Sequence, residues 1–326
     1  MKMALLAQII YQSYLNSQSK LLAYLLLKAR NLLLKVCNPT IKCHFRGFTF
    51  YMPLSHTIFI VQKRYPSYDM QLRNIAQYIY NKKSAFSMVD VGSNIGDTCC
   101  FVGLNDASYL LCEGEKSYAN LIAKNIELNF GKKVMGGGYN ENTKPQFLLY
   151  ECFLGDKMGH YTISLRDGSG TLQSIEDKGN TLQDFESVKI RTLDSVIAET
   201  HFAPHFIKID TDGFDFKVLR GAKQTLTENQ SVLFFEWDKN HLVAQDENPL
   251  SIFSLLNELG YKELLIFDNF GTLLCKIASD DSTNLALLID YTLKSRQNIY
   301  YYDVLTFHKD SLFNAKDYIN FTTKGK

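Results

Sequence analysis

The chain has 326 residues, of which 46% are hydrophobic and 21% charged, a composition typical of a globular protein with a large buried core. Its seven cysteines are odd in number and scattered through apolar runs, which argues against disulfides and favours reduced thiols in a cytoplasmic compartment. No C-x-x-C pair or His/Cys cluster occurs, so the sequence offers no structural zinc site.

The charges are distributed unevenly along the chain. Residues 1–68 contain nine Lys or Arg and no Asp or Glu, whereas the remainder contains 26 Lys or Arg and 34 Asp or Glu. Such asymmetry suggests two parts with different roles. We therefore expect a basic N-terminal helical and hairpin extension over residues 1–68 and a larger domain over residues 69–326.

The N-terminal extension has a helical pattern over residues 4–36, which Pro39 ends, while residues 45–52 and 57–61 are typical of a short hairpin. Lysines and an arginine interrupt its longest apolar run, so we expect no membrane-spanning helix, and signal-peptide features are missing. Leucine stripes between basic residues predict that residues 1–40 dock peripherally on an anionic membrane, with the inner membrane face as the first choice. Packing on the domain or a homodimer contact is the alternative.

Strand and helix patterns alternate through the larger domain, which predicts a mainly parallel α/β sheet with helices on both faces. Residues 131–144 and 166–186 have the composition of surface loops. The expected strands are 87–91, 109–113, 146–153, 205–210, 231–236, 263–267 and 303–307. The expected helices are 69–80, a helix after residue 96, 117–129, 214–228, 250–259 and 284–296.

The segment from residue 89 to residue 97 reads as a buried strand, a glycine-built turn and the start of a helix, which is typical of a site for a nucleotide-like cofactor. The candidate binding residues in it are Asp90, Gly92, Ser93, Asn94, Gly96 and Asp97. Glu113, 21 residues after Gly92 and followed by Gly114, ends the next strand, where a carboxylate can bind ribose hydroxyls.

The detail of this loop decides between two cofactors. A dinucleotide fingerprint needs a third glycine for close helix packing, and Asp97 stands at that position. A loop that opens with Asp90 and contains Asn94 suits an amino-acid tail with both an ammonium and a carboxylate. The sequence therefore favours S-adenosylmethionine over a nicotinamide cofactor.

At this point the chain resembles the FkbM family of S-adenosylmethionine-dependent methyltransferases over residues 85–240. The landmarks are VDVGSNIGD (89–97), CEGEKS (112–117), FLGDKMG (153–159), VKIRTLDSV (188–196), FIKIDTDGFDFKVLRGA (206–222) and LFFEWD (233–238). The chain departs from the family pattern at four positions, where Thr211 replaces a hydrophobe, Asp212 and Asp215 replace glutamates, and Gly114 replaces proline.

The resemblance implies a Rossmann-like class I methyltransferase fold with a seven-stranded sheet. It also implies O-methylation of a sugar hydroxyl in a glycan or glycoconjugate, and it places Asp156 beside the adenine. An adenine or amino-group methyltransferase would usually carry an N/D-P-P-Y-like block where I-D-T-D-G stands, and we expect no nucleic-acid partner.

The catalytic candidates are Asp210, Asp212, His241 and Lys208, because methylation of an alcohol is helped by a general base. Glu236 ends the following strand and is expected on the acceptor side of the site. In a second version, Asp210, Asp212 and Glu236 hold a magnesium ion that acidifies the hydroxyl. Two rival functions stay open: a binding module for S-adenosylmethionine without turnover, and a nicotinamide-dependent oxidoreductase.

Overall fold

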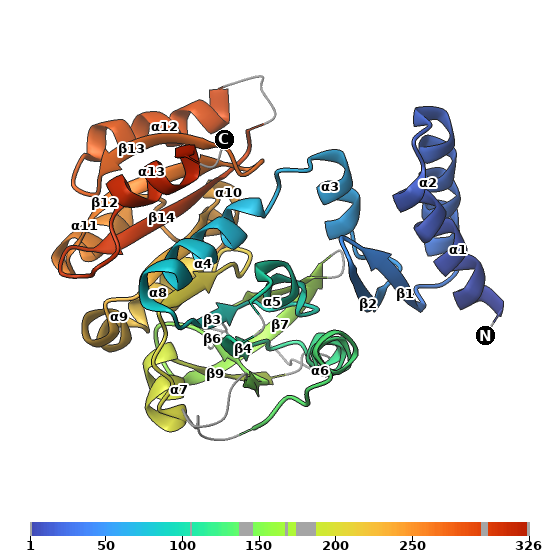
Figure 1. The fold of residues 1–326 in the computed structure, drawn as a ribbon, viewed down its shortest axis with the longest axis horizontal. Coiled ribbons are helices and arrows are strands. Elements are labelled where there is room, and N and C mark those ends of the chain that lie inside the picture. Colours follow the sequence, from blue (N-terminus) through green and yellow to red (C-terminus); the bar gives the residue numbers. More distant parts are fainter. Residues whose placement is uncertain are drawn as a thin grey trace, which may run out of the picture.

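The structure is a computed structural model that describes residues 2–104, 106–136, 146–166, 169–173, 187–294 and 299–324. A central sheet of eight strands has the order β13-β12-β14-β11-β10-β3-β4-β5. Strands β3, β4, β12, β13 and β14 of this sheet are labelled in Figure 1. The parallel strands are β3 (Ser87–Val91), β4 (Ser108–Cys112), β5 (Phe147–Tyr150), β10 (Phe206–Ile209) and β11 (Val232–Trp237). The antiparallel strands are β12 (Tyr261–Asp268), β13 (Leu273–Ala278) and β14 (Tyr302–His308).

The expected fold class, a Rossmann-like class I methyltransferase sheet with helices on both faces, is confirmed. Chain order along the sheet reverses direction between β3 and β10, which places the topological switch point there. The expected count of seven strands is one short. Residues 273–278 form β13 as an additional antiparallel edge strand, after a turn in which Gly271 has a φ of 81°.

Two hydrophobic clusters lie on opposite faces of the sheet, because neighbouring residues of each strand point to opposite sides. One face is covered by α4 (Met70–Lys83), α5 (Asp97–Val102), α6 (Lys116–Phe130) and α13 (Ala315–Lys324). The other is covered by α7 (Leu193–Thr200), α8 (Asp215–Arg220), α9 (Lys223–Asn229), α11 (Ser251–Glu258) and α12 (Ser282–Lys294). The short helix α10 (Lys239–Ala244) follows β11.

A smaller sheet has the order β6-β9-β7-β8 and lies beside the central one. Its strands are β6 (Phe153–Leu154), β7 (Gly159–Arg166), β8 (Ser169–Gln173) and β9 (Ser187–Arg191). The sequence predicted a loop over residues 166–186, but residues 169–173 of this stretch pair with β7 as a hairpin. Residues 174–186, and residues 137–144 of the other predicted loop, lie outside the described part of the chain.

The N-terminal extension contains α1 (Lys2–Asn16), α2 (Lys20–Leu34), β1 (Thr40–Phe45), β2 (Phe48–Pro53) and α3 (Ile58–Arg64). The helical pattern over 4–36 is two helices, because Ser19 caps α2 by accepting a hydrogen bond from the backbone N–H of Leu22. The strand predicted over 57–61 is wrong: this segment belongs to α3, with Phe59 and Ile60 buried. Tertiary packing has overridden its β-branched composition. In the described ranges, no helix is long and apolar enough to cross a bilayer.

Candidate active site

The glycine loop joins β3 to α5 through three residues with positive φ: Gly92 (77°), Asn94 (50°) and Gly96 (76°). A Cβ atom at Gly92 would lie 1.9 Å from the backbone oxygen of Asp210, so this position has room only for glycine. The Ser93 hydroxyl donates to the carbonyl of Asp90 over 2.6 Å and fixes the turn. The loop is therefore held against the end of β10.

Glu113 follows β4 and reaches back to the glycine loop. Its carboxylate accepts hydrogen bonds from the backbone N–H groups of Asn94 and Glu115, both at 2.8 Å. Burial raises the pKa of Glu113 to about 7, although these two hydrogen bonds act to lower it. Glu113, Gly92, Asn94 and Gly114, which are cofactor-binding candidates from the sequence, line the same pocket.

Lys208 holds the ends of two parallel strands together. It lies opposite Asp90 in the sheet register, with its Nζ 3.0 Å from Asp90 Oδ1 and 3.5 Å from Asp210 Oδ2. The same Nζ donates to the Gly92 carbonyl over 3.3 Å. Burial acts to lower the pKa of Lys208, but the two carboxylates outweigh it and raise the pKa above its ordinary value. Lys208 therefore stays an ammonium, which argues against its use as a proton acceptor.

Three of the predicted loop residues lie beneath the pocket, not in its wall. Asp90, Ser93 and Asp97 are buried and do not line it. Burial raises the pKa of Asp97 to about 7. Gly96 also lies outside the lining, where a Cβ would meet Ile122 of α6 at 3.4 Å. These four candidates therefore do not form the wall of the pocket.

Gly114 lies directly under the ring of Phe153. A Cβ atom at this position would lie 2.3 Å from the Phe153 Cγ, which explains why proline does not stand here. Phe153 and Leu154 form β6 and add an apolar wall to the pocket. Asp156, two residues further on, does not line the pocket: its Oδ2 lies 3.6 Å from Arg220 Nε.

The segment after β10 presents two carboxylates to the same pocket. Asp212 (φ 50°) and Gly213 (φ 102°) form a tight turn, in which a Cβ at Gly213 would lie 2.5 Å from the backbone oxygen of His241. Buried Asp215 fixes the turn by accepting hydrogen bonds from the Thr211 hydroxyl (3.1 Å) and the Gly213 N–H (3.2 Å). The Asp210 and Asp212 side chains are 51% and 47% exposed, so both are accessible to a ligand.

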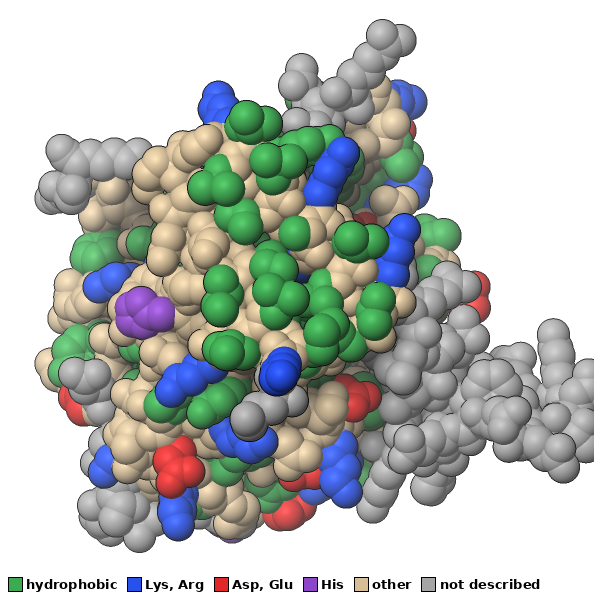
Figure 2. All heavy atoms as spheres, turned by 90° about the vertical axis from the view of Figure 1, so that its right-hand side faces the viewer, with side chains coloured by type: hydrophobic (Ala, Val, Ile, Leu, Met, Phe, Trp, Pro, Cys, Tyr) green, Lys and Arg blue, Asp and Glu red, His purple; other side chains and the backbone are tan. Residues whose placement is uncertain are grey.

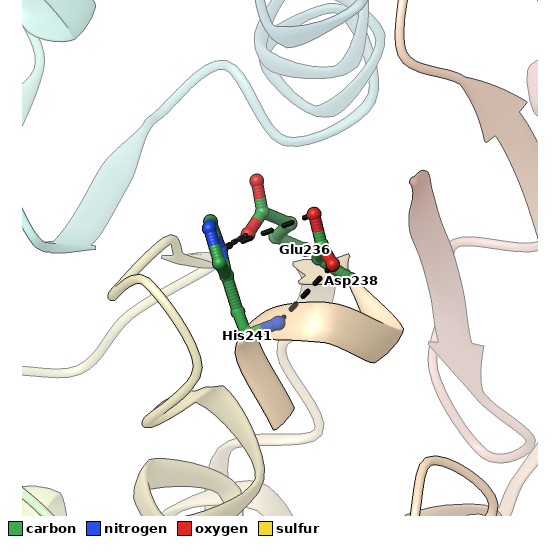
Figure 3. Close-up of side chains that lie close together, drawn as sticks. All are labelled: Glu236, Asp238 and His241. Carbon is green, nitrogen blue, oxygen red and sulfur yellow. Dashed lines mark hydrogen bonds and ion pairs between the residues drawn. The ribbon is translucent and has the colours of Figure 1, made fainter. Parts of the chain in front are cut away.

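His241, at the start of α10, lies among carboxylates (Figure 3). Its Nδ1 is 3.2 Å from Glu236 Oε1 and 4.0 Å from both Asp212 Oδ1 and Asp238 Oδ2. The hydrogen bond with Glu236 and the other carboxylates raise the pKa of His241 to about 9, although burial acts to lower it. At neutral pH this histidine is therefore a cation that can orient Asp212.

The magnesium ligands proposed from the sequence are only partly brought together. Among the described residues, the group with ligand atoms within 4.8 Å of one another consists of Glu236, Asp238 and His241; Asp210 and Asp212 are not in it. Asp238 Oδ1 already caps α10 by accepting from the backbone N–H groups of Asn240 (2.7 Å) and His241 (3.2 Å). Figure 3 shows the His241 ring turned toward Glu236, an arrangement that the hydrogen bond between them explains.

A second group of polar side chains near these carboxylates was missed by the sequence analysis; it borders a hollow separate from the pocket above, and we call it the second wall. Asp303 of β14 is the cross-strand partner of Glu236. Burial, with Glu236, Asp69 and Asp210 nearby, raises the pKa of Asp303. The hydroxyls of Tyr68 and Tyr301 share a hydrogen bond of 2.9 Å, and both tyrosines border a hollow that is also lined by Tyr65, Tyr300, Asn269 and Phe270. The tyrosine-rich strings YPSY (65–68) and YYYD (300–303) were the available signal.

A family model described as "Methyltransferase FkbM domain" matches residues 90–263, just over half of the chain. No curated protein matches this chain. Among solved structures, the FkbM methyltransferase of Methylobacillus flagellatus is 16% identical with a TM-score of 0.35, over 54% of this chain and 36% of that one. This chain therefore spans about a third of that protein's length.

Two other solved structures align over more of the chain. The plantazolicin methyltransferase BamL, in complex with a triazolic desmethylPZN analog and SAH, is 10% identical with a TM-score of 0.42, over 79% of this chain and 91% of that one. The putative transferase PH0793 of Pyrococcus horikoshii is 9% identical with a TM-score of 0.39, over 87% and 81%. On the extent of the family match, the chain belongs to the FkbM methyltransferase family.

Proposed function

We propose that this methyltransferase uses S-adenosylmethionine to methylate a hydroxyl of a sugar or glycoconjugate. The observation that carries the proposal is one pocket lined both by Glu113 and the glycine loop and by the carboxylates of Asp210 and Asp212. A site for the cofactor and groups able to receive a proton are thereby adjacent.

The residues of the pocket fit S-adenosylmethionine. The Glu113 carboxylate can accept hydrogen bonds from ribose hydroxyls, and Phe153 and Leu154 offer an apolar surface to the adenine. The backbone at Gly92 allows close approach of the amino-acid tail. When bound, this cofactor supplies an electrophilic methyl group on a sulfonium. The structure of BamL with SAH is consistent with such a ligand.

The proton of the acceptor hydroxyl goes, in this proposal, to Asp210 or Asp212. Both side chains are half-exposed in the pocket, whereas Lys208 is committed to two carboxylates. His241 is protonated at neutral pH, because its pKa is raised to about 9 by Glu236 and the neighbouring acids. Its role is to orient Asp212 toward the acceptor.

A polyhydroxylated acceptor suits the second wall. Asp69, Asp303 and Glu236 can accept hydrogen bonds from hydroxyl groups, and Tyr68 and Tyr301 offer both hydroxyls and ring faces. A carbohydrate presents the matching combination of hydroxyls and apolar ring faces. We place the reaction in the cytoplasm, where the seven cysteines, all free thiols in the structure, would stay reduced.

Calorimetric titration with S-adenosylmethionine, S-adenosylhomocysteine and NAD, followed by a methyl-transfer screen over sugar acceptors, tests the proposal. We expect binding of the first two ligands and transfer to a sugar hydroxyl. Binding of NAD alone would instead indicate an oxidoreductase. Binding of S-adenosylhomocysteine with no transfer to any acceptor would indicate a binding module without turnover.

A further inference from the structure

The outer side of α1 and α2 is a large hydrophobic surface (Figure 2). Residues 3–36 contribute ten of the twenty large hydrophobic side chains that are exposed in the described part of the chain. We call this surface the hydrophobic face; its most exposed aliphatic members are Leu5 (59%), Ile9 (54%), Leu21 (70%), Leu25 (52%), Leu32 (66%) and Val36 (76%). Contiguous exposure of this kind marks an interaction surface in a folded protein.

Positive charges accompany the hydrophobic face without any acid to balance them. Lys2, Lys20, Lys28 and Lys35 on the two helices are exposed, and residues 1–68 contain no Asp or Glu. The Lys28 Nζ lies 4.7 Å from the centre of the Tyr24 ring, so a cation sits directly beside the apolar surface. Figure 2 shows basic side chains among and beside the hydrophobic ones.

The opposite side of the two helices is fixed to the rest of the protein. Arg30 donates to the carbonyls of Leu54 (3.0 Å) and Ser55 (2.6 Å), and the Lys63 Nζ donates to the carbonyls of Tyr14, Leu15 and Ser17 at the end of α1. Tyr11 is fully buried beneath the helix. Arg30 and Lys63 are therefore engaged in hydrogen bonds within the protein, and these bonds hold the two helices in place. The hydrophobic face is thus already formed in the free protein.

We propose that the hydrophobic face docks the enzyme on the surface of an anionic lipid bilayer. The leucines and isoleucine would enter the boundary between headgroups and acyl chains, and the surrounding lysines would meet anionic headgroups. A second copy of this chain is a poorer occupant. A two-fold dimer would place this face against itself and bring the lysines of both copies together with no carboxylate between them.

Co-sedimentation of the full chain with vesicles tests this proposal. The probes are vesicles of phosphatidylcholine alone and of phosphatidylcholine with phosphatidylserine, each at low and high salt. We expect binding to the phosphatidylserine vesicles at low salt and its loss at high salt. Equal binding to both vesicle types, or no binding to either, would overturn the proposal.

Two pairs of substitutions separate the apolar and the charged contributions. Leu5→Gln with Leu21→Gln should weaken vesicle binding about 20-fold and leave its salt dependence unchanged. Each of these leucines, when half of its side chain enters the bilayer, should contribute about fivefold to the binding constant. Lys20→Gln with Lys28→Gln should weaken it by a similar factor of about 20 and flatten the salt dependence.

Matched controls lie elsewhere on the protein. Leu287→Gln, on α12, replaces a leucine that is 59% exposed like Leu5, and Lys223→Gln removes an exposed lysine of α9. Neither control should change vesicle binding. Light scattering without lipid gives the oligomeric state: a dimer that Leu5→Gln with Leu21→Gln dissociates would assign the face to a second copy and overturn membrane docking.

Discussion

We name the two sides of the proposed active site after the ligands proposed for them. The cofactor half is the glycine loop with Glu113, and the acceptor half is Asp210, Asp212 and His241 with the second wall. The two halves are built in different ways. In the cofactor half, Gly92 packs against the backbone of Asp210, and Glu113 is held by two backbone N–H groups. In the acceptor half, Asp210 and Asp212 are half-exposed, and His241 is positioned by the side chain of Glu236. A rigid, backbone-built half suits a ligand that is identical in every turnover. The other half depends more on side chains, so we expect the choice of acceptor to respond to substitutions there.

The largest expected effect separates transfer from cofactor binding. Asp210→Asn or Asp212→Asn should slow methyl transfer by about 10²- to 10⁴-fold, because a group that accepts the proton is lost, with little change in affinity for S-adenosylhomocysteine. Single-turnover kinetics and calorimetry measure the two quantities. Asp280→Asn, in an exposed turn, is the control and should change neither.

The same assay decides the role of a metal. We expect a chelator to leave the transfer rate unchanged, since Asp238 is already used as a helix cap and His241 is bonded to Glu236. Activity that is lost with chelator and restored by magnesium would replace the proton-acceptor role with the metal version.

The rigidity of the cofactor half can be broken at Gly92. Gly92→Ala should lower the free energy of unfolding by about 3 kcal/mol for two reasons: the added Cβ clashes with the Asp210 carbonyl, and the positive φ at this position is strained for alanine. Gly131→Ala is the matched control: its φ is 63°, but nothing lies within 4 Å of the added Cβ. It should cost only about 1 kcal/mol. Equal losses in urea denaturation would show that the close contact is unimportant.

Glu113→Gln should weaken binding of S-adenosylhomocysteine by about 1–3 kcal/mol, the range for losing charge-assisted hydrogen bonds. In the unsubstituted protein, affinity should rise as the pH rises through about 7, where the buried carboxyl ionises, and the variant should lack this dependence.

The stability of the free protein should change in the opposite direction. A raised pKa favours the folded state below the ordinary value of 4.5, and that contribution is lost as the pH passes about 7. A pH-independent affinity would remove Glu113 from the cofactor contact.

The smallest expected effect lies in the acceptor half. Tyr301→Phe removes one hydrogen bond to Tyr68 and one hydroxyl from the second wall, so KM for the acceptor should rise several-fold, equivalent to about 1 kcal/mol. Affinity for S-adenosylhomocysteine should stay constant. Tyr291→Phe, on α12, is the control. A changed cofactor affinity in Tyr301→Phe would mean that the two halves are not independent.

The cofactor half was largely predictable from sequence because it depends on local chemistry. The strand over residues 87–91 was predicted to the residue, and the turn that follows needs glycines at positions where the backbone has positive φ. Glu113 was found by its spacing from Gly92. Each signal lies within about one strand, turn and helix, where periodicity and turn chemistry are informative.

The acceptor half was less predictable because its contacts join distant parts of the chain. Tyr68 and Tyr301 are 233 residues apart, and no local pattern indicates that they meet. Lys208 was named as a candidate base for the acceptor hydroxyl; only the sheet register shows that it pairs with Asp90. The prediction of a strand over residues 57–61 failed for the same reason, since α3 is stabilised by packing on the distant helix α1.

Two hydrogen bonds in sequence connect the N-terminal extension to the glycine loop. The Tyr11 hydroxyl donates to the carbonyl of His56, and the His56 Nε2–H donates to Asn94 Oδ1 over 2.8 Å. Burial lowers the pKa of His56 to about 4, so this ring is neutral at physiological pH and its bond to Asn94 does not depend on charge. Positions 56 and 94 should therefore vary together in evolution, and a relative that lost the α1–α2 pair would need a new donor to the His56 carbonyl.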